Sequence, residues 1–139
     1  MRAYFDASVI IAAFLSPFGG SAKLLIYRKL GAITAITSQT VVEEVLEKSE
    51  KLQKSREELE NFIAESGLVV YRSIEPNDMF LYGGWVDPDD IHLIAGAKLT
   101  KCTHLVTLDK KHLLRPQIQK QCLPLVLLSP KELLERIIV

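Results

Sequence analysis

Four acidic positions stand where short apolar segments end and the next element begins, and together they could bind a metal ion. They are Asp6, Glu44 with Glu43 beside it, Asp90 and Asp109. Two carboxylates about 4 Å apart repel by about 4 kcal/mol at an effective dielectric constant of about 20. If these acids converge, their pKa values must rise or a cation must neutralise them. An all-oxygen ligand set suits Mg²⁺ or Mn²⁺, and the lack of a Cys/His cluster argues against zinc.

The acid-rich run 87–90 has the composition of a helix start. Asp87 suits the N-cap position, and acids in the following turn are favourable near the positive end of the helix, so capping accounts for Asp87 and Asp89. Asp90 differs because apolar residues follow it at i+4 (Ile94) and i+7, which places it at the head of the core-facing stripe. We therefore interpret Asp90 as a ligand.

The other acids have structural interpretations when each is taken singly. Asp6 and Asp109 could close a strand by accepting hydrogen bonds from backbone amides of the following turn. Glu43 and Glu44 both flank the apolar stripe of one predicted helix, so helical periodicity does not choose between them. Convergence of the whole set is what favours a metal site.

Short apolar segments alternate with amphipathic ones along the chain, which positions these acids. We predict strands at 2–6, 32–37, 68–71, 104–108 and 123–128; helices at 8–14, 21–30, from 37 or 38, at 54–66, 88–99 and from 130; a helical turn at 110–114; and a long loop at 73–86. This alternation predicts an α/β fold with a mainly parallel sheet of about five strands sandwiched by helices. In such sheets chemistry gathers at the carboxyl ends of the strands.

The composition predicts one domain over residues 1–139. Hydrophobic residues make up 48% of the 139, enough to fill a single core, and the longest apolar run, 9–15, is too short to span a bilayer. The start of the chain lacks a signal-peptide pattern, so we expect no membrane segment and a cytoplasmic protein. Cys102 and Cys122 are expected to be reduced. Basic and acidic residues number 17 each, so net charge does not decide on a nucleic-acid partner.

Four segments of the chain, in this order, resemble the PIN-domain family of metal-dependent nucleases. They are residues 4–10, 38–46, 87–97 and 105–109, and the resemblance spans nearly the whole chain. It is strongest to the small prokaryotic members, which are often toxins paired with antitoxins. The resemblance implies a PIN-like fold and hydrolysis of phosphodiester bonds, most often in RNA, with one or two Mg²⁺ or Mn²⁺ ions.

The resemblance also assigns roles to particular residues. The implied metal ligands and catalytic acids are Asp6, Glu44, Asp90 and Asp109, with Ser8 and Thr107 steadying the first and last of them. Glu44 is preferred to Glu43 because it lies six residues after Ser38. The chain departs from the family at Ser8, where many relatives carry Asn, and at His112, where a further Asp often follows the last acid.

Basic and aromatic residues near the acids are candidates for substrate contacts. Lys110 and Lys111 directly follow Asp109, and Arg115 and Lys23 are further candidates for phosphate binding.

Two histidines and two aromatic residues near the acids each have a structural alternative. His92 and His112 could transfer protons, although surface or partly buried positions without a catalytic role are the simpler interpretation. Tyr82 and Trp85 could stack on a base, although packing of their loop is the simpler interpretation.

The implied partners are a single-stranded RNA substrate, a cognate antitoxin and a second copy of the chain, joined through apolar positions of the helix at 21–30. The alternative function is a PIN-like scaffold that binds RNA or a protein without cutting, which the missing acid at His112 favours. Aspartyl-phosphate chemistry is disfavoured because the position two residues after Asp6 is Ser8 rather than Asp, and because Ser129-Pro130 stands where receiver domains carry Lys.

Overall fold

Five parallel strands form one sheet in the order β3-β2-β1-β4-β5 in the computed structural model, which describes residues 1–138. The strands are β1 Arg2–Phe5, β2 Thr34–Ser38, β3 Val69–Tyr71, β4 His104–Val106 and β5 Val126–Leu128. Every neighbouring pair runs parallel. The predicted α/β fold with a mainly parallel five-stranded sheet is confirmed.

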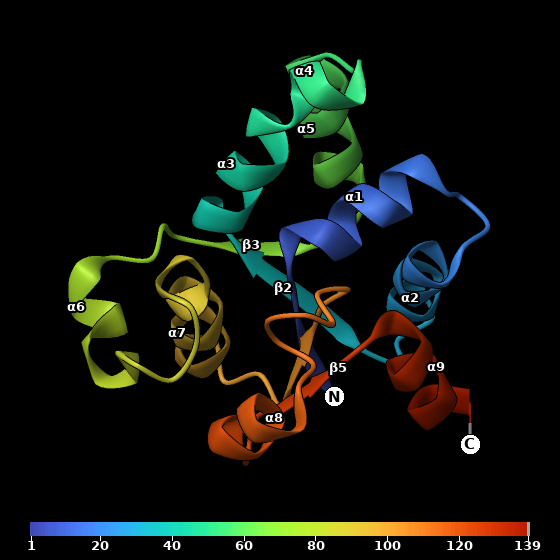
Figure 1. The fold of residues 1–139 in the computed structure, drawn as a ribbon. Coiled ribbons are helices and arrows are strands. Elements are labelled where there is room, and N and C mark those ends of the chain that lie inside the picture. Colours follow the sequence, from blue (N-terminus) through green and yellow to red (C-terminus); the bar gives the residue numbers. More distant parts are fainter. Residues whose placement is uncertain (139) are drawn as a thin grey trace.

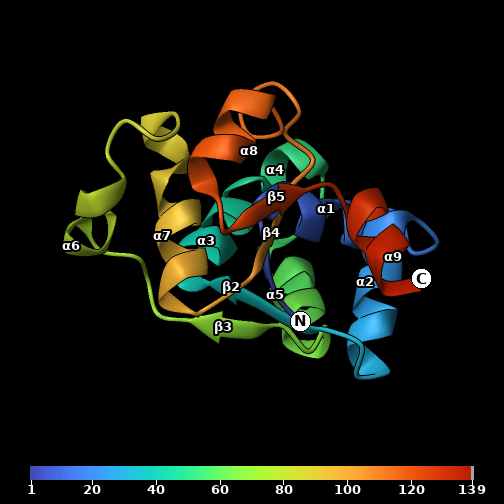
Figure 2. The same cartoon turned by 90° about the horizontal axis from the view of Figure 1, so that it is seen from below.

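Helices cover both faces of this sheet (Figure 1). They are α1 Ala7–Leu15, α2 Gly20–Lys29, α3 Gln39–Glu47, α4 Ser49–Leu52, α5 Arg56–Glu65, α6 Pro76–Met79, α7 Ile91–Leu99, α8 Pro116–Cys122 and α9 Pro130–Ile138, with 3₁₀ turns η1 Phe80–Tyr82 and η2 Pro88–Asp90. Figure 2 shows α6 and α7 on one side of the strands and α2 and α9 on the other. Within residues 1–138 no single helix is long and apolar enough to span a bilayer; α1 and α2 reach that requirement only as a pair, with a 95° bend between them.

The central strand and one central helix form the middle of the core. In β1, Ala3, Tyr4 and Phe5 are fully buried, as expected for a parallel strand covered on both faces. In α7 every residue from His92 to Ala97 is buried, and the helix packs on β1, β2 and β4. A helix that is apolar around its whole circumference is a core helix, so α7 is held rigidly against the sheet.

Tyr4 joins three elements of this core. Its ring fills the space above Gly96 of α7, where a Cβ atom would overlap the ring. Its hydroxyl donates a hydrogen bond to Ser38 Oγ at 2.8 Å, and Ser38 Oγ in turn accepts from Val41 N at the start of α3. One side chain therefore fixes β1, α7 and α3 relative to one another.

Several short helices were not predicted from the sequence. The predicted loop at 73–86 contains α6 and η1, and the predicted helix at 54–66 is preceded by α4. The predicted helical turn at 110–114 is a single turn closed by bonds from Leu113 N and Leu114 N to Asp109 O, the first with the i to i+4 spacing of an α-helix, and the unpredicted α8 follows it. α8 is mostly polar and begins with Pro116 at its first position, so it lacks the apolar period that identifies a longer helix.

The predicted strands at 104–108 and 123–128 are each shorter than expected by two or more residues. The predicted strand at 104–108 ends at Val106, because the backbone then turns and Asp109 N bonds to Thr107 Oγ1. The predicted strand at 123–128 begins at Val126, because Pro124 has no N–H to give to a ladder and Leu125 N closes a turn with Cys122 O. A side-chain bond replaces the ladder after β4, and a backbone turn replaces it before β5.

Candidate active site at the carboxyl edge of the sheet

The strand order has its switch point between β1 and β4, where winding of the chain turns from one side of the sheet to the other. Open parallel sheets bind ligands outside the carboxyl ends of the strands at such a point. Asp6 follows β1 directly, and its backbone N–H bonds to Val106 O at the end of β4. Thr107 and Asp109 follow β4. The first and last acids of the predicted set therefore flank the switch point.

Asp6 lies at the N-cap of α1 and is held by three donors. Its Oδ1 accepts from Ala7 N at 2.6 Å, and its Oδ2 accepts from Thr107 Oγ1 at 2.7 Å and from Ser8 Oγ at 3.2 Å. Burial raises the pKa of the Asp6 carboxyl, the three hydrogen bonds oppose that rise, and the charge of Glu44 adds to it. The structure thus places both Ser8 and Thr107 on the first acid.

Thr107 also connects Asp6 to Asp109, because Thr107 Oγ1 accepts from Asp109 N at 3.1 Å. The Asp109 side chain is about 30% exposed and faces His112. His112 N donates to Asp109 Oδ1 at 2.9 Å, and His112 Nδ1 lies 3.2 Å from Oδ2. His112, which stands where relatives often carry a further acid, is therefore a partner of the last acid and is itself exposed.

Asp90 ends η2 and immediately precedes α7. Asp87 caps this turn, accepting from Asp89 N at 3.1 Å, so its predicted capping role is confirmed. Burial raises the pKa of Asp90 to about 6, and the negative charges of Asp6, Asp109 and Asp87 contribute to the rise. Burial is the largest cause, and the charges of Asp6 and Asp109 act on Asp90 in addition to it.

The two glutamates of α3 point in different directions. Glu43 is exposed, accepts from Gln39 Nε2 at 3.0 Å and lies 3.7 Å from Arg56. Glu44 Oε1 is buried and lies 3.0 Å from His92 Nε2, without a hydrogen-bond partner of good geometry among residues 1–138. The charge of Glu44 raises the pKa of Asp6, so Glu44 rather than Glu43 belongs to the acidic cluster.

His92 lies beside the acidic cluster, and its burial was not predicted from the sequence. We expected a surface or partly buried side chain, but His92 is only 8% exposed and lies on the core helix α7. Its Nε2 faces Glu44, while its Nδ1 is buried without a partner in the described part of the chain. The apolar run 93–97 directly after His92 was the available signal, because a helix that is apolar on every side buries its polar residues too.

The other predicted substrate contacts near the acids differ in exposure: the basic residues face solvent and the aromatic residues pack on the core. Lys110, Lys111 and Arg115 are exposed in the turn after Asp109 and at the start of α8. Tyr82 and Trp85 pack on the core, with ring centroids 5.2 Å apart in an edge-to-face pair. The packing interpretation therefore accounts for both aromatic residues.

Lys23 is exposed on α2 and lines a groove with apolar residues of α2 and α9. This groove is separate from the acidic cluster at the strand ends, so Lys23 is not grouped with Lys110 and Lys111.

The cluster has the donor chemistry of a hard cation site. Within residues 1–138, no three His, Cys, Asp or Glu side chains are arranged so that they could together hold a metal ion. Two observations nevertheless fit a cation: the pKa values of Asp6 and Asp90 are raised, and Glu44 Oε1 is buried without a hydrogen bond. A divalent cation would relieve both.

Metal-free protein is expected to lose stability as pH rises from about 4 to above 6, relative to Asp90→Asn. The pKa of Asp90 is raised from 3.8 to about 6. Between these values the folded state binds more protons than the unfolded state, so the free energy of unfolding falls with rising pH. Urea denaturation in EDTA over a pH series measures the difference between the two proteins. A difference that does not change with pH would show that Asp90 titrates normally.

Solved structures with the same fold include proteins from three bacteria. VapBC2 from Rickettsia felis, bound to a DNA fragment from its promoter, matches with a TM-score of 0.64 and 19% identity over 93% of this chain and 98% of that one. VapBC-1 from nontypeable Haemophilus influenzae gives 0.63 and 13%, covering 94% and 99%. A toxin-antitoxin complex from Klebsiella pneumoniae gives 0.58 and 18%, covering 92% and 97%.

The family follows from a direct sequence comparison. Among curated protein sequences none matches this chain significantly. A family model described as PIN domain matches residues 2–111, which include all four acids of the cluster. The match confirms the resemblance found in the sequence, and the chain belongs to the PIN domain family.

Proposed function

We propose that this protein is an Mg²⁺- or Mn²⁺-dependent endoribonuclease, acting in the cytoplasm as the toxin of a toxin-antitoxin pair. The observation that carries the proposal is the Asp90 carboxyl, whose pKa is raised by burial and by Asp6 and Asp109 at the switch point of a PIN domain. Clustered carboxylates with raised pKa values are typical of sites that bind a cation or move protons.

The residues of the cluster divide into ligands and residues that position them. Asp6, Glu44, Asp90 and Asp109 would hold the cation, which when bound would supply Lewis-acid assistance to the attack of water on the phosphodiester. Thr107 and Ser8 fix the orientation of the Asp6 carboxylate, and Thr107 also fixes the backbone of Asp109. His92 faces Glu44 from the rigid helix α7 and limits its rotation. Lys110 and Lys111 would contact phosphates of single-stranded RNA.

The solved relatives support a protein partner. All three are described as toxin-antitoxin or VapBC proteins, and this chain matches almost the full length of each matched chain. By this likeness the protein would bind a cognate antitoxin.

A second copy of the chain is expected to pack on the α2–α9 groove, a hollow of about 340 Å³ lined by Lys23, Ile26, Tyr27, Leu30, Leu134 and Ile138. Ile26 and Leu30 are 53% and 73% exposed there. Leu30→Glu places a charge on this apolar surface and is expected to convert a dimer into a monomer, as measured by light scattering. Phe80→Glu is the control and should stay dimeric, because Phe80 directly follows α6. Helix α6 lies on the opposite side of the strands from α2 and α9 (Figure 2). If the wild-type protein is a monomer in light scattering, the proposed dimer is wrong.

The alternative function is a PIN scaffold that binds RNA or a protein without hydrolysis. It is favoured by His112, which contacts both carboxylate oxygens of Asp109 and so competes with a cation for them. The two functions differ in one property, cleavage.

Purified protein incubated with labelled single-stranded RNA or DNA in Mn²⁺, Mg²⁺ or EDTA tests the proposal. We expect cleavage of RNA that requires the divalent ion and is absent in EDTA. Cleavage of DNA but not of RNA would show that the protein is a deoxyribonuclease rather than a ribonuclease. Metal and RNA binding without cleavage of any substrate would establish the scaffold instead.

Thr107→Val is expected to lower the cleavage rate about 10- to 100-fold, the usual effect of removing a residue that orients a metal ligand. The change keeps the size of the side chain but removes the donor to Asp6 and the acceptor for Asp109 N, so the pKa of Asp6 rises further. Thr103→Val, just before β4, is the matched control. Rates measured over a series of Mn²⁺ concentrations should show weaker binding of Mn²⁺ by Thr107→Val only. Equal rates for the two variants would show that Thr107 has no role in the site.

A further inference from the structure

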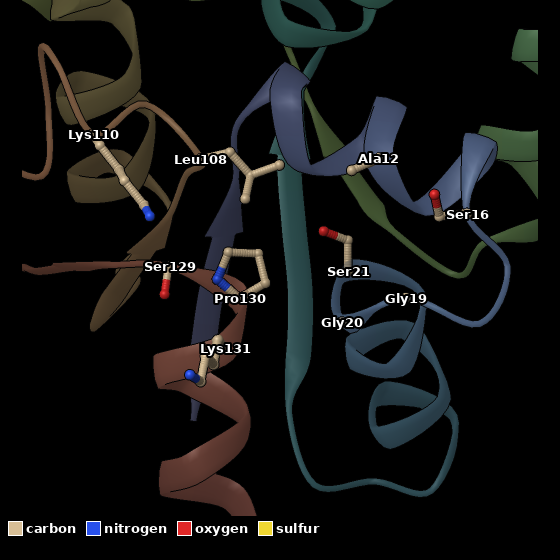
Figure 3. Close-up of a pocket in the computed structure, with 10 residues that line it drawn as sticks. All are labelled: Ala12, Ser16, Gly19, Gly20, Ser21, Leu108, Lys110, Ser129, Pro130 and Lys131. Carbon is tan, nitrogen blue, oxygen red and sulfur yellow. The ribbon is translucent and has the colours of Figure 1, made fainter.

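A second hollow lies beside the acidic cluster, on the α2 side of the sheet edge (Figure 3). Its volume is about 380 Å³, in the range of small-molecule sites. It is enclosed by the end of α1, the start of α2, the segment after β4 and the start of α9. The lining residues are Ala12, Ser16, Gly19, Gly20, Ser21, Leu108, Lys110, Ser129, Pro130 and Lys131. We call it the Ser21 hollow.

Ser21 is the buried polar residue of this hollow. It is only 6% exposed, and its side-chain oxygen is not one of the fully enclosed polar atoms without a partner among residues 1–138, so the hydroxyl opens onto the hollow. Figure 3 shows the Ser21 oxygen directed into the open space toward Pro130. Polar groups buried in proteins are normally paired, so a buried hydroxyl aimed into a cavity indicates a position for a ligand atom.

The surroundings of Ser21 favour an anion. α2 has ten residues and begins after Gly19, which has no side chain to cap it, so its first N–H groups are free to bind negative charge. Two lysines, Lys110 and Lys131, line the hollow, and its lining contains no acidic residue. Ser129 N donates to Glu132 Oε1 and Ser129 Oγ accepts from Glu132 N, so the Ser129 hydroxyl keeps its proton as a second donor for an anion.

The segment after β4 is shared between the hollow and the acids. Thr107 and Asp109 contact the acidic cluster, whereas Leu108 and Lys110, the alternate residues, line the hollow. Leu108 N also bonds to Ser8 Oγ, which itself holds Asp6. An extended chain placed along this segment would therefore reach the acids and the hollow together.

We propose that the Ser21 hollow binds a backbone phosphate of the nucleic-acid substrate, next to the phosphodiester that is cut. The phosphate oxygens would accept from Ser21 Oγ and the first amides of α2, with Lys110 and Lys131 neutralising their charge. The apolar atoms of Ala12, Leu108 and Pro130 would contact the adjoining ribose. This inference rests on the proposed nuclease function, because it takes the acidic cluster as the cutting site.

The test uses Ser21→Ala and Lys131→Gln in the full chain, with Lys54→Gln, an exposed lysine between α4 and α5, as the control. Binding of a short fluorescein-labelled single-stranded RNA in EDTA is measured by anisotropy at several salt concentrations. Ser21→Ala should weaken binding about three- to tenfold, as loss of one hydrogen bond of ordinary net strength does. Lys131→Gln should weaken it similarly and reduce the salt slope by about 0.7. Lys54→Gln should change neither.

The unfolding midpoint separates ligand binding from a structural role of Ser21. Removing a hydroxyl that opens onto the hollow should leave the midpoint in urea unchanged or raised. Loss of stability together with affinity would overturn the inference, as would unchanged affinity. Backbone NMR adds a direct measurement: the Gly20 and Ser21 amides should shift with RNA at concentrations where inorganic phosphate has no effect. Equal shifts with inorganic phosphate would show a free-anion site and overturn the inference.

Cleavage assays keep this inference distinct from the proposed function. If the wild-type protein cuts RNA and Lys131→Gln has the same KM as the wild type, the protein is a nuclease but the Ser21 hollow is not a substrate site. If no nucleic acid is cut but RNA shifts the NMR signals of the Gly20 and Ser21 amides, the Ser21 hollow binds RNA although the protein is not a nuclease. A raised KM with an unchanged kcat in Lys131→Gln supports both.

Discussion

Asp90→Asn is expected to lower metal-dependent RNA cleavage by about a thousandfold or more, since it removes a charged group that must stabilise the reacting centre. The variant keeps the size of the side chain and one acceptor oxygen. It removes the negative charge that burial and the carboxylates of Asp6 and Asp109 disfavour in the metal-free protein. Stability without metal should therefore rise at neutral pH while activity is lost, which excludes unfolding as the cause.

Asp89→Asn is the matched control for this prediction. Asp89 is the preceding residue, carries the same charge and is exposed. Its substitution should leave cleavage within about twofold of wild type and leave the unfolding midpoint in EDTA unchanged. Mn²⁺ should raise the midpoint of the wild type and of Asp89→Asn, and raise that of Asp90→Asn much less. Equal cleavage by Asp90→Asn and the wild type would show that the acidic cluster is not the cutting site.

The positions of the strand-end acids were predictable from the sequence. Asp6 and Asp109 each follow a short apolar segment, and parallel strands bring their carboxyl ends to one edge whatever the lengths of the connections. The place of Asp90 at the start of a buried helix was predictable from the helix-start composition of residues 87–90, whereas its role as a ligand stays a prediction. These predictions depend on local periodicity and on one general property of parallel sheets.

Side-chain direction and burial on α3 and α7 depended on tertiary packing. Glu43 and Glu44 flank the same apolar stripe, and only the position of α7 decides that Glu44 meets His92 while Glu43 meets solvent and Arg56. His92 is polar, so its own type predicts exposure, yet it lies on a helix buried on every side.

The Ser21 hollow was equally hidden in the sequence. Ser21 reads as the ordinary first residue of a helix, and its burial arises only because α1, α9 and the segment after β4 meet around it. Contacts between distant segments, which no local period encodes, determined these features.

Gly96→Ala is expected to destabilise the protein by about 2–3 kcal/mol, at the upper end of the usual effect of overpacking a core. Any Cβ at position 96 would overlap the Tyr4 ring, and Tyr4 cannot withdraw because it is fully buried and its hydroxyl is bonded to Ser38. α7 must therefore move away from β1. Ordinary helix propensity predicts the opposite, since replacing Gly by Ala in a helix normally stabilises it by up to about 1 kcal/mol.

Gly20→Ala is the control, because a Cβ there makes only an ordinary contact, 3.6 Å from Leu134 Cδ1. It should be neutral or slightly stabilising in urea denaturation, against the loss at Gly96. The displacement of α7 has a second consequence, since α7 carries His92 and follows Asp90, while β1 ends at Asp6. Folded Gly96→Ala protein should therefore cleave RNA at least about tenfold more slowly, because small misplacements of catalytic groups have large effects on rate. Full activity in a destabilised variant would show that the spacing of the acids does not depend on the contact between Tyr4 and Gly96.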